Sequence, residues 1–300
     1  MAPSPSRPFR IGTRGSPLAL AQAAMAAEAL RAAHGWDEAA VEIVPVTTTG
    51  DRIQDRPLAE VGGKALWTRE LDRCLRDGRT DASVHSMKDV ETFRPHALAV
   101  AAMLARADPR DRLVGAASLD ALRRGARVGT SSPRRRAQLL ARRPDLAIVT
   151  MRGNVHTRLA KLGRGDADAT LLAAAGLDRL GLGEIGAVLD ELIPAPAQGA
   201  IGIELRAGDE AARALVAAID HEPTRRCVDA ERAFLAAIGG DCRSAVAALA
   251  TCDDGGVRLR AEILAPDGTE AQSGASADPA ELARRLLAAA SPRLRAMFAG

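Results

Sequence analysis

Aromatic residues are almost missing from this 300-residue sequence, which has no tyrosine, four phenylalanines and two tryptophans. Six aromatic side chains offer few platforms for stacked bases, which argues against a protein that binds nucleic acid. The four cysteines form no Cys-x-x-Cys pair and no zinc-ligand spacing. The sequence therefore predicts neither a disulfide framework nor a metal site.

Long apolar runs are missing too. The longest stretch without a charged residue, Gly15 to Ala27, has 13 residues, whereas a membrane-spanning helix needs about 18 or more. The opening residues, MAPSPSRPFR, are polar and interrupted by proline, unlike a signal peptide. With 47% hydrophobic and 26% charged residues, the composition is typical of a globular protein of two or three domains, which we expect in the cytoplasm.

Lysine is scarce, since only three of the 41 basic residues are lysines. A GC-rich genome explains most of this preference for arginine, but not where the arginines lie. Residues 121–165 hold twelve arginines and lysines against one acid, Asp145, although the net charge of the whole chain is only +3. Such clustering indicates a surface that faces anions.

Expected strands and helices alternate along the chain. Strands are expected over 9–13, 41–47, 82–85, 127–129, 146–150 and 200–205, and helices over 17–33, 68–76, 133–143 and 154–162. A further unit then has a helix over 225–238, strands over 245–251 and 257–264, and a helix over 279–290. This alternation predicts an α/β fold with mostly parallel sheets.

Two junctions, Gly12–Pro17 and Gly129–Pro133, each place a hydroxyl side chain and a proline directly after a strand. Either this is chance similarity between turns, or two lobes of similar build face each other across a cleft. For the second case we expect a first lobe of residues 1–103 with 200–221, a second lobe of 104–199, and a C-terminal domain of 222–300. Helix N-termini after such strands suit carboxylate or phosphate ligands.

Lys88-Asp89 follows an apolar segment, so the pair is expected at the carboxyl end of a buried strand. It is either a surface ion pair or a carboxylate kept ionised beside a cation, able to accept N–H hydrogen bonds and exchange protons. Neighbouring His85 belongs to the strand itself, and we expect it to be structural.

Arg134, Arg135 and Arg136 occupy the first turn of an expected helix, where they oppose the helix dipole unless an anion is bound there. Lys64 follows two glycines in an expected loop, either as a charged flap or as a solvated loop. Cys242 lies between Asp241 and Arg243 after two glycines, and Arg243 favours a thiolate while Asp241 opposes it.

Nine segments, in order over about residues 11 to 242, together resemble the porphobilinogen deaminase family. They are IGTRGSPLALAQA (11–23), TTGDRIQD (48–55), VGGKALWTREL (61–71), DASVHSMKDV (81–90), VGTSSPRRRAQL (128–139), RGNVHTRLAKL (152–162), AAGLDRLGL (174–182), PAQGAIGIE (196–204) and ERAFLAAIGGDC (231–242). No single segment is decisive, but nine in the same order are very specific.

The resemblance implies two lobes resembling type II periplasmic binding proteins plus a small C-terminal α/β domain. It implies an enzyme that condenses four porphobilinogen molecules head to tail into hydroxymethylbilane, releasing ammonia at each step of this part of tetrapyrrole biosynthesis. A dipyrromethane cofactor, joined to Cys242 by a thioether, primes the chain. The enzyme is expected to be a monomer that passes its product to uroporphyrinogen-III synthase.

The resemblance also implies roles for individual residues. Asp89 is the expected catalytic residue, which binds pyrrole N–H groups and stabilises positive charge. The expected cofactor-binding residues besides Cys242 are Lys88, Thr130, Ser131, Ser132, Arg134, Arg135 and Arg158. The expected substrate-binding residues are Arg14, Ser16, Lys64, Arg152, Arg179 and Gln198. Each pyrrole ring carries an acetate and a propionate, and arginine is well suited to binding carboxylates.

Three positions depart from the family pattern. Asp241 stands between Gly240 and Cys242, Ala245 replaces a common proline, and Glu91 replaces a proline after the Lys-Asp-Val motif. The first two affect the shape of the loop that carries Cys242. Two other readings remain open on local sequence alone: an anion-binding receptor of the same architecture, and a nucleic-acid binder that uses residues 121–165.

Overall fold

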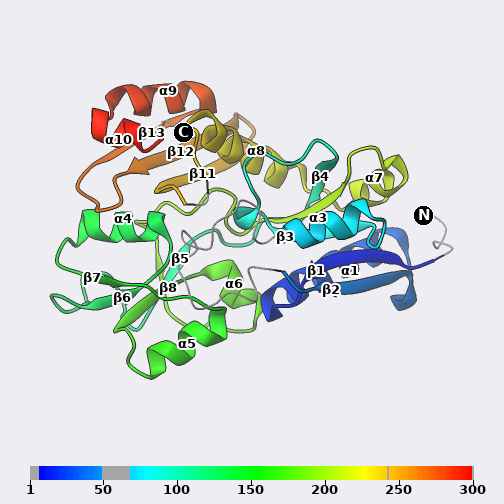
Figure 1. Ribbon diagram of the computed structural model, residues 1–300, viewed down its shortest axis with the longest axis horizontal. Coiled ribbons are helices and arrows are strands. Elements are labelled where there is room, and N and C mark those ends of the chain that lie inside the picture. The colour runs from blue at the N-terminus through cyan, green and yellow to red at the C-terminus, as the bar shows by residue number, and fades with distance from the viewer. Residues whose placement is uncertain (1–6, 49–67, 242, 299–300) are drawn as a thin grey trace. The chain divides into compact units, whose positions relative to one another are not determined.

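The computed structural model describes residues 7–48, 68–241 and 243–298, which form three β-sheets with helices packed against them (Figure 1). The predicted α/β class is confirmed. The chain divides into two compact units, residues 1–107 with 200–225 and residues 108–199 with 226–300. In the part of the chain that the structure describes, no helix has the length and apolar character needed to cross a bilayer.

The first unit contains a five-stranded sheet. Its strands, in spatial order, are β2 (Val41–Val46), β1 (Phe9–Arg14), β3 (Ala82–Ser86), β10 (Ile201–Arg206) and β4 (Leu98–Met103). Strand β1 runs parallel to both β2 and β3, whereas β10 runs antiparallel to β3 and β4. Its helices are α1 (Pro17–His34), α3 (Arg69–Arg76) and α7 (Glu210–Val216), with short 3-10 turns η1 (Glu38–Ala40), η2 (Met87–Asp89) and η3 (Ala217–Ile219).

Helix α1 begins and ends where the sequence predicts. The hydroxyl of Ser16 accepts a hydrogen bond from the N–H of Ala19 at 3.3 Å, and Pro17 occupies the first turn. Gly35 ends the helix in the left-handed conformation, with φ of 68°. The helix buries an alanine-rich face, including Ala23 and Ala26, in the core that contains Ile11 of β1.

The second unit has a five-stranded sheet of its own. The order is β7 (Ala147–Val149), β6 (Arg127–Gly129), β8 (Ala169–Ala173), β5 (Asp111–Val114) and β9 (Ala187–Leu189). Helices α4 (Pro133–Arg142), α5 (Val155–Gly163) and α6 (Ala174–Arg179) follow strands of this sheet. Strand β6 is parallel to β7 and β8, and β5 is antiparallel to β8 and β9.

A three-stranded antiparallel sheet completes the second unit, with strands β11 (Val246–Asp253), β12 (Gly256–Leu264) and β13 (Ala271–Ser276). Its helices are α8 (Glu222–Ala237), α9 (Pro279–Ala289) and α10 (Pro292–Ala296). Phe234, Ile263 and Leu282 are fully buried in the core between sheet and helices. Strand β13 and helix α10 were not predicted from the sequence.

The prediction of mostly parallel sheets is wrong, because only four of the ten strand pairs among the described residues are parallel. Parallel neighbours need a crossover connection, usually a helix. The sequence shows such helices after β1, β6 and β7. Strand β10 follows the loop 194–199 instead of a helix, so the alternation says nothing about its direction.

Parallel pairing brings two sets of loops together. Because β1 and β3 are parallel neighbours, the segments that follow them, beginning at Gly15 and Met87, lie at the same edge of the first sheet. The segments that follow β6, β7 and β8 likewise share an edge of the second sheet. Most of the residues that the sequence singled out are in these two sets of loops.

Glu231 on α8 joins three parts of the second unit. Its carboxylate is fully buried and accepts hydrogen bonds from the backbone N–H of Ala197 at 2.5 Å and of Ala250 at 2.7 Å. Ala197 has a φ of 61°, the only positive value among the described residues other than glycine. The carboxylate therefore fixes both the strained loop before Gln198 and the strand β11.

We predict that Glu231→Gln lowers the free energy of unfolding by about 2–5 kcal/mol. The side-chain amide has only one oxygen, so its NH2 group would face a backbone N–H that now donates to the carboxylate. Chemical denaturation followed by circular dichroism measures the change. Glu210→Gln, at an exposed side chain, is the control and should change the midpoint little. Equal midpoints for the two variants would contradict the role given to Glu231.

Candidate active site

Asp89 lies in a small pocket of the first unit. The residues that line it are Arg14, Ala19, Gln22, Thr68, Val84, His85, Ser86, Asp89 and Val90. Asp89 belongs to the turn η2, which directly follows the buried strand β3, as the sequence predicts. The N–H of Met87 donates to the carbonyl of Ala200 at 3.1 Å, which ties this turn to the residue before β10.

Arg14 reaches the same pocket from the end of β1. The structure thus brings together a guanidinium and a carboxylate that are 75 positions apart in the chain. Ser16 caps α1, and Gln22 accepts a hydrogen bond from the hydroxyl of Ser86 at 2.9 Å. The pocket therefore has a fixed polar wall with one cation and one carboxylate.

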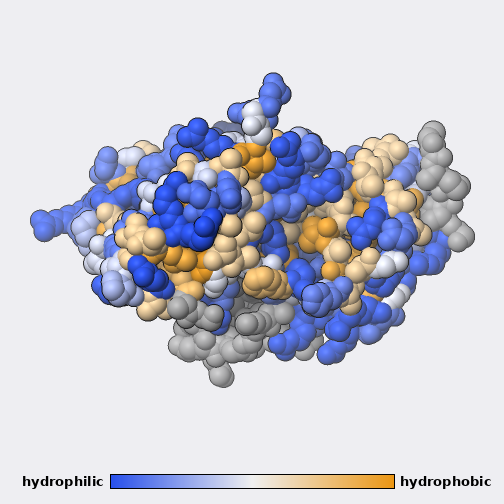
Figure 2. All heavy atoms as spheres, turned by 90° about the horizontal axis from the view of Figure 1, so that it is seen from above, coloured by the Kyte–Doolittle hydropathy of each residue, from blue (hydrophilic) through white to orange (hydrophobic). Residues whose placement is uncertain are grey.

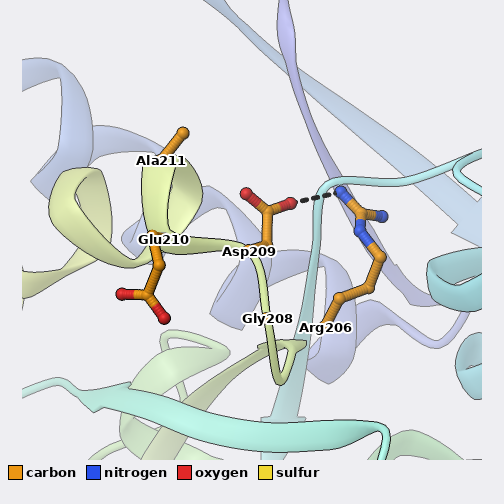
Figure 3. A pocket seen from close by; sticks show the side chains of 5 residues that line it. All are labelled: Arg206, Gly208, Asp209, Glu210 and Ala211. Carbon is orange, nitrogen blue, oxygen red and sulfur yellow. Dashed lines mark hydrogen bonds and ion pairs between the residues drawn. The ribbon is translucent and has the colours of Figure 1, made fainter.

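A second pocket of the first unit is an open hollow beside α7, lined by Arg206, Gly208, Asp209, Glu210 and Ala211 (Figure 3). Asp209 caps α7 through the N–H of Ala212 and pairs with Arg206 at 2.6 Å. Arg206 and Asp209 form an ion pair, and Asp209 also caps the helix, so we assign the hollow no function.

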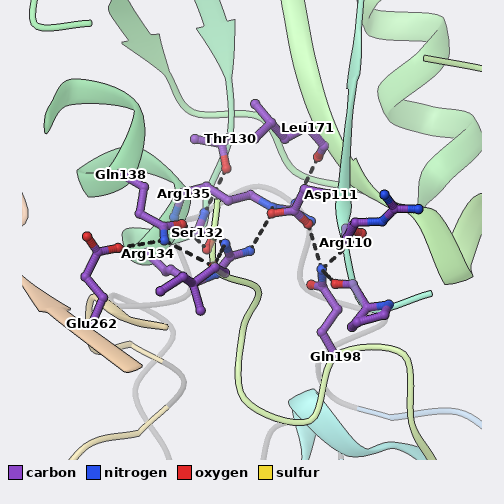
Figure 4. A network of polar contacts seen from close by, with 12 residues as sticks. Arg110, Asp111, Thr130, Ser132, Arg134, Arg135, Gln138, Leu171, Gln198 and Glu262 are labelled. Atoms are coloured by element: carbon purple, nitrogen blue, oxygen red, sulfur yellow. Dashed lines mark hydrogen bonds and ion pairs between the residues drawn. The ribbon is translucent and has the colours of Figure 1, made fainter. Parts of the chain in front are cut away.

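Arg134 and Arg135 form a buried cluster with Asp111 in the second unit, here called the arginine cluster (Figure 4). The Nη2 atoms of Arg134 and Arg135 lie 2.8 Å and 2.7 Å from the two carboxylate oxygens of Asp111. Arg134 is 3% exposed, Arg135 6% and Asp111 1%. The anion that the sequence predicts beside these arginines is thus supplied in part by the chain itself.

Further groups fix the arginine cluster from three directions. Nη1 of Arg135 donates to the carbonyl of Leu171 at 2.9 Å, and Nη1 of Arg134 donates to Gln138 at 2.8 Å. Gln138 in turn donates to Glu262 of β12 at 2.8 Å. Nε2 of Gln198 donates to Asp111 at 2.7 Å (Figure 4). The cluster is therefore rigid.

Burial and charge act in opposite directions on the cluster. Burial raises the pKa of Asp111, but the two guanidiniums outweigh it and hold the pKa far below its usual range. Burial lowers the pKa of Arg134, although Asp111 opposes this. Glu262 adds a second negative charge near Arg134. Among the described residues, Nε of Arg134 is buried without a hydrogen-bond partner. The cluster therefore keeps a buried donor that needs an acceptor.

Arg152 and Arg179 share this property. Nη1 of Arg152 and Nε of Arg179 are buried and have no hydrogen-bond partner within the described part of the chain. Burial lowers the pKa of Arg179 to about 10, so the side chain remains a cation at neutral pH. Its Nη2 donates to the carbonyl of Gly199 at 2.6 Å, beside Gln198. These two side chains resemble the arginine cluster in presenting donors that lack acceptors.

The other described residues of the second unit that the sequence singled out form hydrogen bonds that hold the local backbone. Ser131 donates to the carbonyl of Met151, Ser132 caps α4 through the N–H of Arg135, and Thr130 accepts the N–H of Ser132. Nε of Arg158 donates to the carbonyl of Gly153 at 2.9 Å. Thr130, Ser131 and Ser132 lie in the loop after β6, and Arg158 lies in the first turns of α5.

Many basic residues of 121–165 are paired with acids elsewhere in the chain or close by. Arg123 pairs with Asp168, Arg143 with Asp145 and Arg164 with Asp166. These contacts neutralise much of the charge that the sequence shows as an excess. The structure gives no support to binding of nucleic acid by this segment.

Lys64 and Cys242 lie outside the described residues. The residues beside Cys242 are described, and Asp241 organises them: its carboxylate accepts from the N–H and guanidinium of Arg243 at 2.7–2.9 Å. Burial raises the pKa of Asp241, but these hydrogen bonds outweigh it and lower the pKa. Three residues after Cys242, Ala245 packs against Ala137 of α4, one turn from Arg134.

Sequence analysis missed the buried acids, among them Asp111 and Glu204. Glu204 stands alone in the apolar run Ala200–Leu205, which is a signal that a charged side chain has buried partners. Asp111 shows no such signal, because it follows Asp108 and Arg110 in a polar stretch. Among the described residues, no group of His, Cys, Asp and Glu side chains could hold a metal ion.

Comparison with known proteins identifies two matching family models. The model "Porphobilinogen deaminase, dipyromethane cofactor binding domain" matches residues 9–214, and "Porphobilinogen deaminase, C-terminal domain" matches residues 225–289. The porphobilinogen deaminase of Sphingopyxis alaskensis is 60% identical, with 99% of this chain and 98% of that protein covered. That of Paracoccus denitrificans is 52% identical, with 93% and 90% covered.

Solved structures show only weak likeness. The VFT2 domain of Bordetella pertussis BvgS aligns with a TM-score of 0.40 and 17% identity, over 71% of this chain and 85% of that one. A TRAP periplasmic solute binding protein from Desulfovibrio salexigens aligns with a TM-score of 0.42 and 11% identity, over 73% and 74%.

We predict that Asp111→Asn lowers the free energy of unfolding by about 3–5 kcal/mol, because it leaves two guanidiniums buried without a counter-charge. The low pKa of Asp111 means that its contribution is complete above the ordinary carboxyl pKa of about 4. This contribution is lost as the pH falls further, through the lower pKa that Asp111 has in the folded protein. Thermal and urea unfolding at pH 7 measure the loss. Asp145→Asn, whose partner Arg143 is partly exposed, is the control, and a loss no larger than the control's contradicts the prediction.

Proposed function

Because the chain belongs to the porphobilinogen deaminase family, we propose that its Asp89 pocket and its arginine cluster carry out different parts of that family's reaction. The enzyme condenses four porphobilinogen molecules head to tail into hydroxymethylbilane, with release of ammonia, in tetrapyrrole biosynthesis. It is a transferase with a dipyrromethane cofactor. The cofactor, when bound, supplies the pyrrole terminus to which the substrate units are added.

The residues present fit such a cofactor. Buried N–H groups of Arg134, Arg152 and Arg179 have no acceptor in the described structure. An unsatisfied buried donor costs about 1–3 kcal/mol, and more when charged. Carboxylates of pyrrole rings are acceptors of the right charge, and a hydrogen bond to a charged group contributes about 1.5–3 kcal/mol. This match between unsatisfied donors and an acid-rich ligand is the observation that carries the proposal.

Thr130, Ser131, Ser132, Arg134, Arg135 and Arg158 are proposed to hold the cofactor, together with Lys88. Cys242 is proposed to bind it covalently through its sulfur. The contact of Ala245 with α4 supports this assignment, since it brings the neighbourhood of Cys242 to the helix that begins with the arginine cluster.

Arg14, Ser16, Lys64, Arg152, Arg179 and Gln198 are proposed to bind the carboxylates and polar groups of incoming porphobilinogen. Gln198 has a second task, since its amide is anchored on Asp111 and on the carbonyl of Pro109 at 2.6 Å. It therefore links the arginine cluster to the loop beside Arg179.

Asp89 is proposed as the catalytic residue. Arg14 lines the same pocket. The Asp89 carboxylate accepts hydrogen bonds from pyrrole N–H groups, stabilises positive charge as the amine leaves, and takes up the proton that the attacking ring loses. Such acid–base catalysis contributes about 10²–10⁴-fold to a rate.

The cellular setting is proposed in outline. The three-part division into residues 1–103 with 200–221, 104–199 and 222–300 is supported by the separate match of 225–289. We propose a cytoplasmic monomer that passes its product to uroporphyrinogen-III synthase. Figure 2 shows hydrophobic and hydrophilic side chains mixed over one face of the protein.

We predict that Cys242→Ser abolishes the covalent adduct, because a hydroxyl is a far weaker nucleophile than a thiolate. Intact-mass spectrometry should find the native protein heavier than its sequence by two porphobilinogen units less two molecules of ammonia. The Cys242→Ser protein should have the sequence mass and give no colour with Ehrlich's reagent. Cys252→Ser is the matched control and should carry the adduct. A loaded Cys242→Ser protein would refute the attachment site.

We predict that Asp89→Asn lowers kcat by about 10²–10⁴-fold, because the amide can neither hold a proton nor stabilise positive charge. Stopped assays of porphobilinogen consumption measure kcat, and intact mass shows whether the adduct is present. Asp145→Asn should keep its activity. Turnover by loaded Asp89→Asn within a few fold of the native rate would remove Asp89 from the mechanism.

A further inference from the structure

A buried cluster of charged residues lies directly behind the Asp89 pocket, and the mechanism above makes no use of it. Its members come from four elements or their flanks and are Thr68, Asp72, His85, Glu91, Arg94 and Glu204. Glu204 is 0% exposed and His85 6%. Two of the six, Thr68 and His85, also line the Asp89 pocket.

Arg94 holds the cluster together. Its Nε and Nη2 donate to the two carboxylate oxygens of Glu204 at 2.8 Å and 2.9 Å, which is a bidentate pair. The same guanidinium donates to Asp72 and Glu91 at 2.5 Å each. Arg94 therefore anchors the segment that follows Asp89 to α3 and to β10.

Glu204 determines which nitrogen of His85 carries a proton. Burial raises the pKa of Glu204, but hydrogen bonds from His85 and Arg94 outweigh it and lower the pKa to about 2. An ionised carboxylate only accepts hydrogen bonds. Nε2 of His85, 3.0 Å from Glu204, is therefore the donor, which leaves Nδ1 as the ring nitrogen with an acceptor lone pair in the neutral imidazole. Nδ1 has no hydrogen-bond partner among the described residues.

Several charged groups lie around His85. Glu204 of β10 binds its Nε2, and Asp72 of α3 interacts with it electrostatically. Asp89 and Arg14 line the same pocket as His85. Arg94 and Glu91 belong to the same cluster through their contacts with Glu204 and with each other.

We propose that Glu204 is a positioning residue that acts through His85, and that His85 receives the proton which Asp89 takes up in each addition. The inference rests on the proposed function of Asp89. When the attacking ring loses its α-proton, the C–H electron pair returns to the ring and the proton goes to the Asp89 carboxylate. Asp89 then gives this proton to Nδ1 of His85, and the imidazolium releases it to water.

This relay meets a requirement of a repeated reaction. Asp89 must be a carboxylate again before the next porphobilinogen is added, so its proton has to leave the pocket each time. Imidazole is the side chain that exchanges protons between about pH 5 and 8. A carboxylate that binds one imidazole nitrogen keeps the other ready to accept a proton, as in carboxylate–histidine pairs of hydrolases.

The test compares Glu204→Gln with a matched control, Asp81→Asn. Asp81 is 4% exposed, has its pKa lowered to about 2 and pairs with Arg7 at 2.6 Å. It precedes β3, however, whereas Asp89 follows that strand. Both variants should lose stability in thermal unfolding, so a purely structural role predicts similar behaviour for the two.

The first readout is the dependence of kcat on pH, measured per molecule of loaded enzyme as counted by intact mass. For Glu204→Gln we expect a kcat at least about tenfold lower, with KM within about twofold of the native value. We also expect the acidic limb to move to lower pH by about one unit or more, because the imidazolium has lost a counter-charge. Asp81→Asn should keep the native profile. Identical profiles for the two variants would overturn the proposal.

The second readout needs no activity. The chain has five histidines, and comparison with His85→Gln assigns the His85 signals in an NMR titration. In the native protein Nε2 should stay protonated while Nδ1 titrates, and in Glu204→Gln the midpoint should move to lower pH. A His85 signal that does not titrate between about pH 5 and 8, or that titrates alike in both proteins, would overturn the relay.

His85→Gln covers the case in which Glu204→Gln fails to fold, because the glutamine amide can still donate to Glu204. We expect a folded, loaded protein that lacks the acidic limb, and a native profile would overturn the proposal. Asp89→Asn distinguishes a failure of the catalytic role of Asp89 from a failure of the His85 relay. If it keeps full turnover, the proposed function of Asp89 fails. If it loses turnover while Glu204→Gln matches Asp81→Asn, only the relay fails.

Discussion

The pairing of Asp111 with Arg134 and Arg135 is the interaction on which the second unit depends. Burial of two guanidiniums is possible because one carboxylate lies between them, and Gln138, Gln198 and main-chain carbonyls take up most remaining donors. The compensation stops short of completion, since Nε of Arg134 has no hydrogen-bond partner among the described residues. A site of this kind is rigid before its ligand arrives and gains stability when a carboxylate completes it.

The first unit also has a buried cluster of charged side chains, but there the acids outnumber the cations. Three carboxylates, those of Asp72, Glu91 and Glu204, share the single guanidinium of Arg94. Both arrangements lie at or next to the carboxyl ends of parallel strands, where loops from distant parts of the chain meet. The fold thus places the proposed cofactor-binding cluster in one unit and the proposed catalytic pocket in the other.

Local signals in the sequence predicted where several helices begin or end and where Asp89 lies. Ser16, Pro17 and Gly35 define α1, and Ser132 with Pro133 and Asn154 define the starts of α4 and α5. The position of Asp89 after a buried strand also followed from a short apolar segment. These features depend on neighbours in the chain. Strand direction and the partners of buried charges do not, which is why the antiparallel β10 and the acids Asp111 and Glu204 were missed.

The central claim is that unsatisfied guanidinium donors exist to bind the carboxylates of a pyrrole chain. A crystal structure of the cofactor-loaded protein tests it most directly. The account predicts pyrrole carboxylate oxygens within about 2.7–3.2 Å of Nε of Arg134, Nη1 of Arg152 or Nε of Arg179. Carboxylates that bind elsewhere, with these three nitrogens still unpaired or bonded only to water, would contradict it.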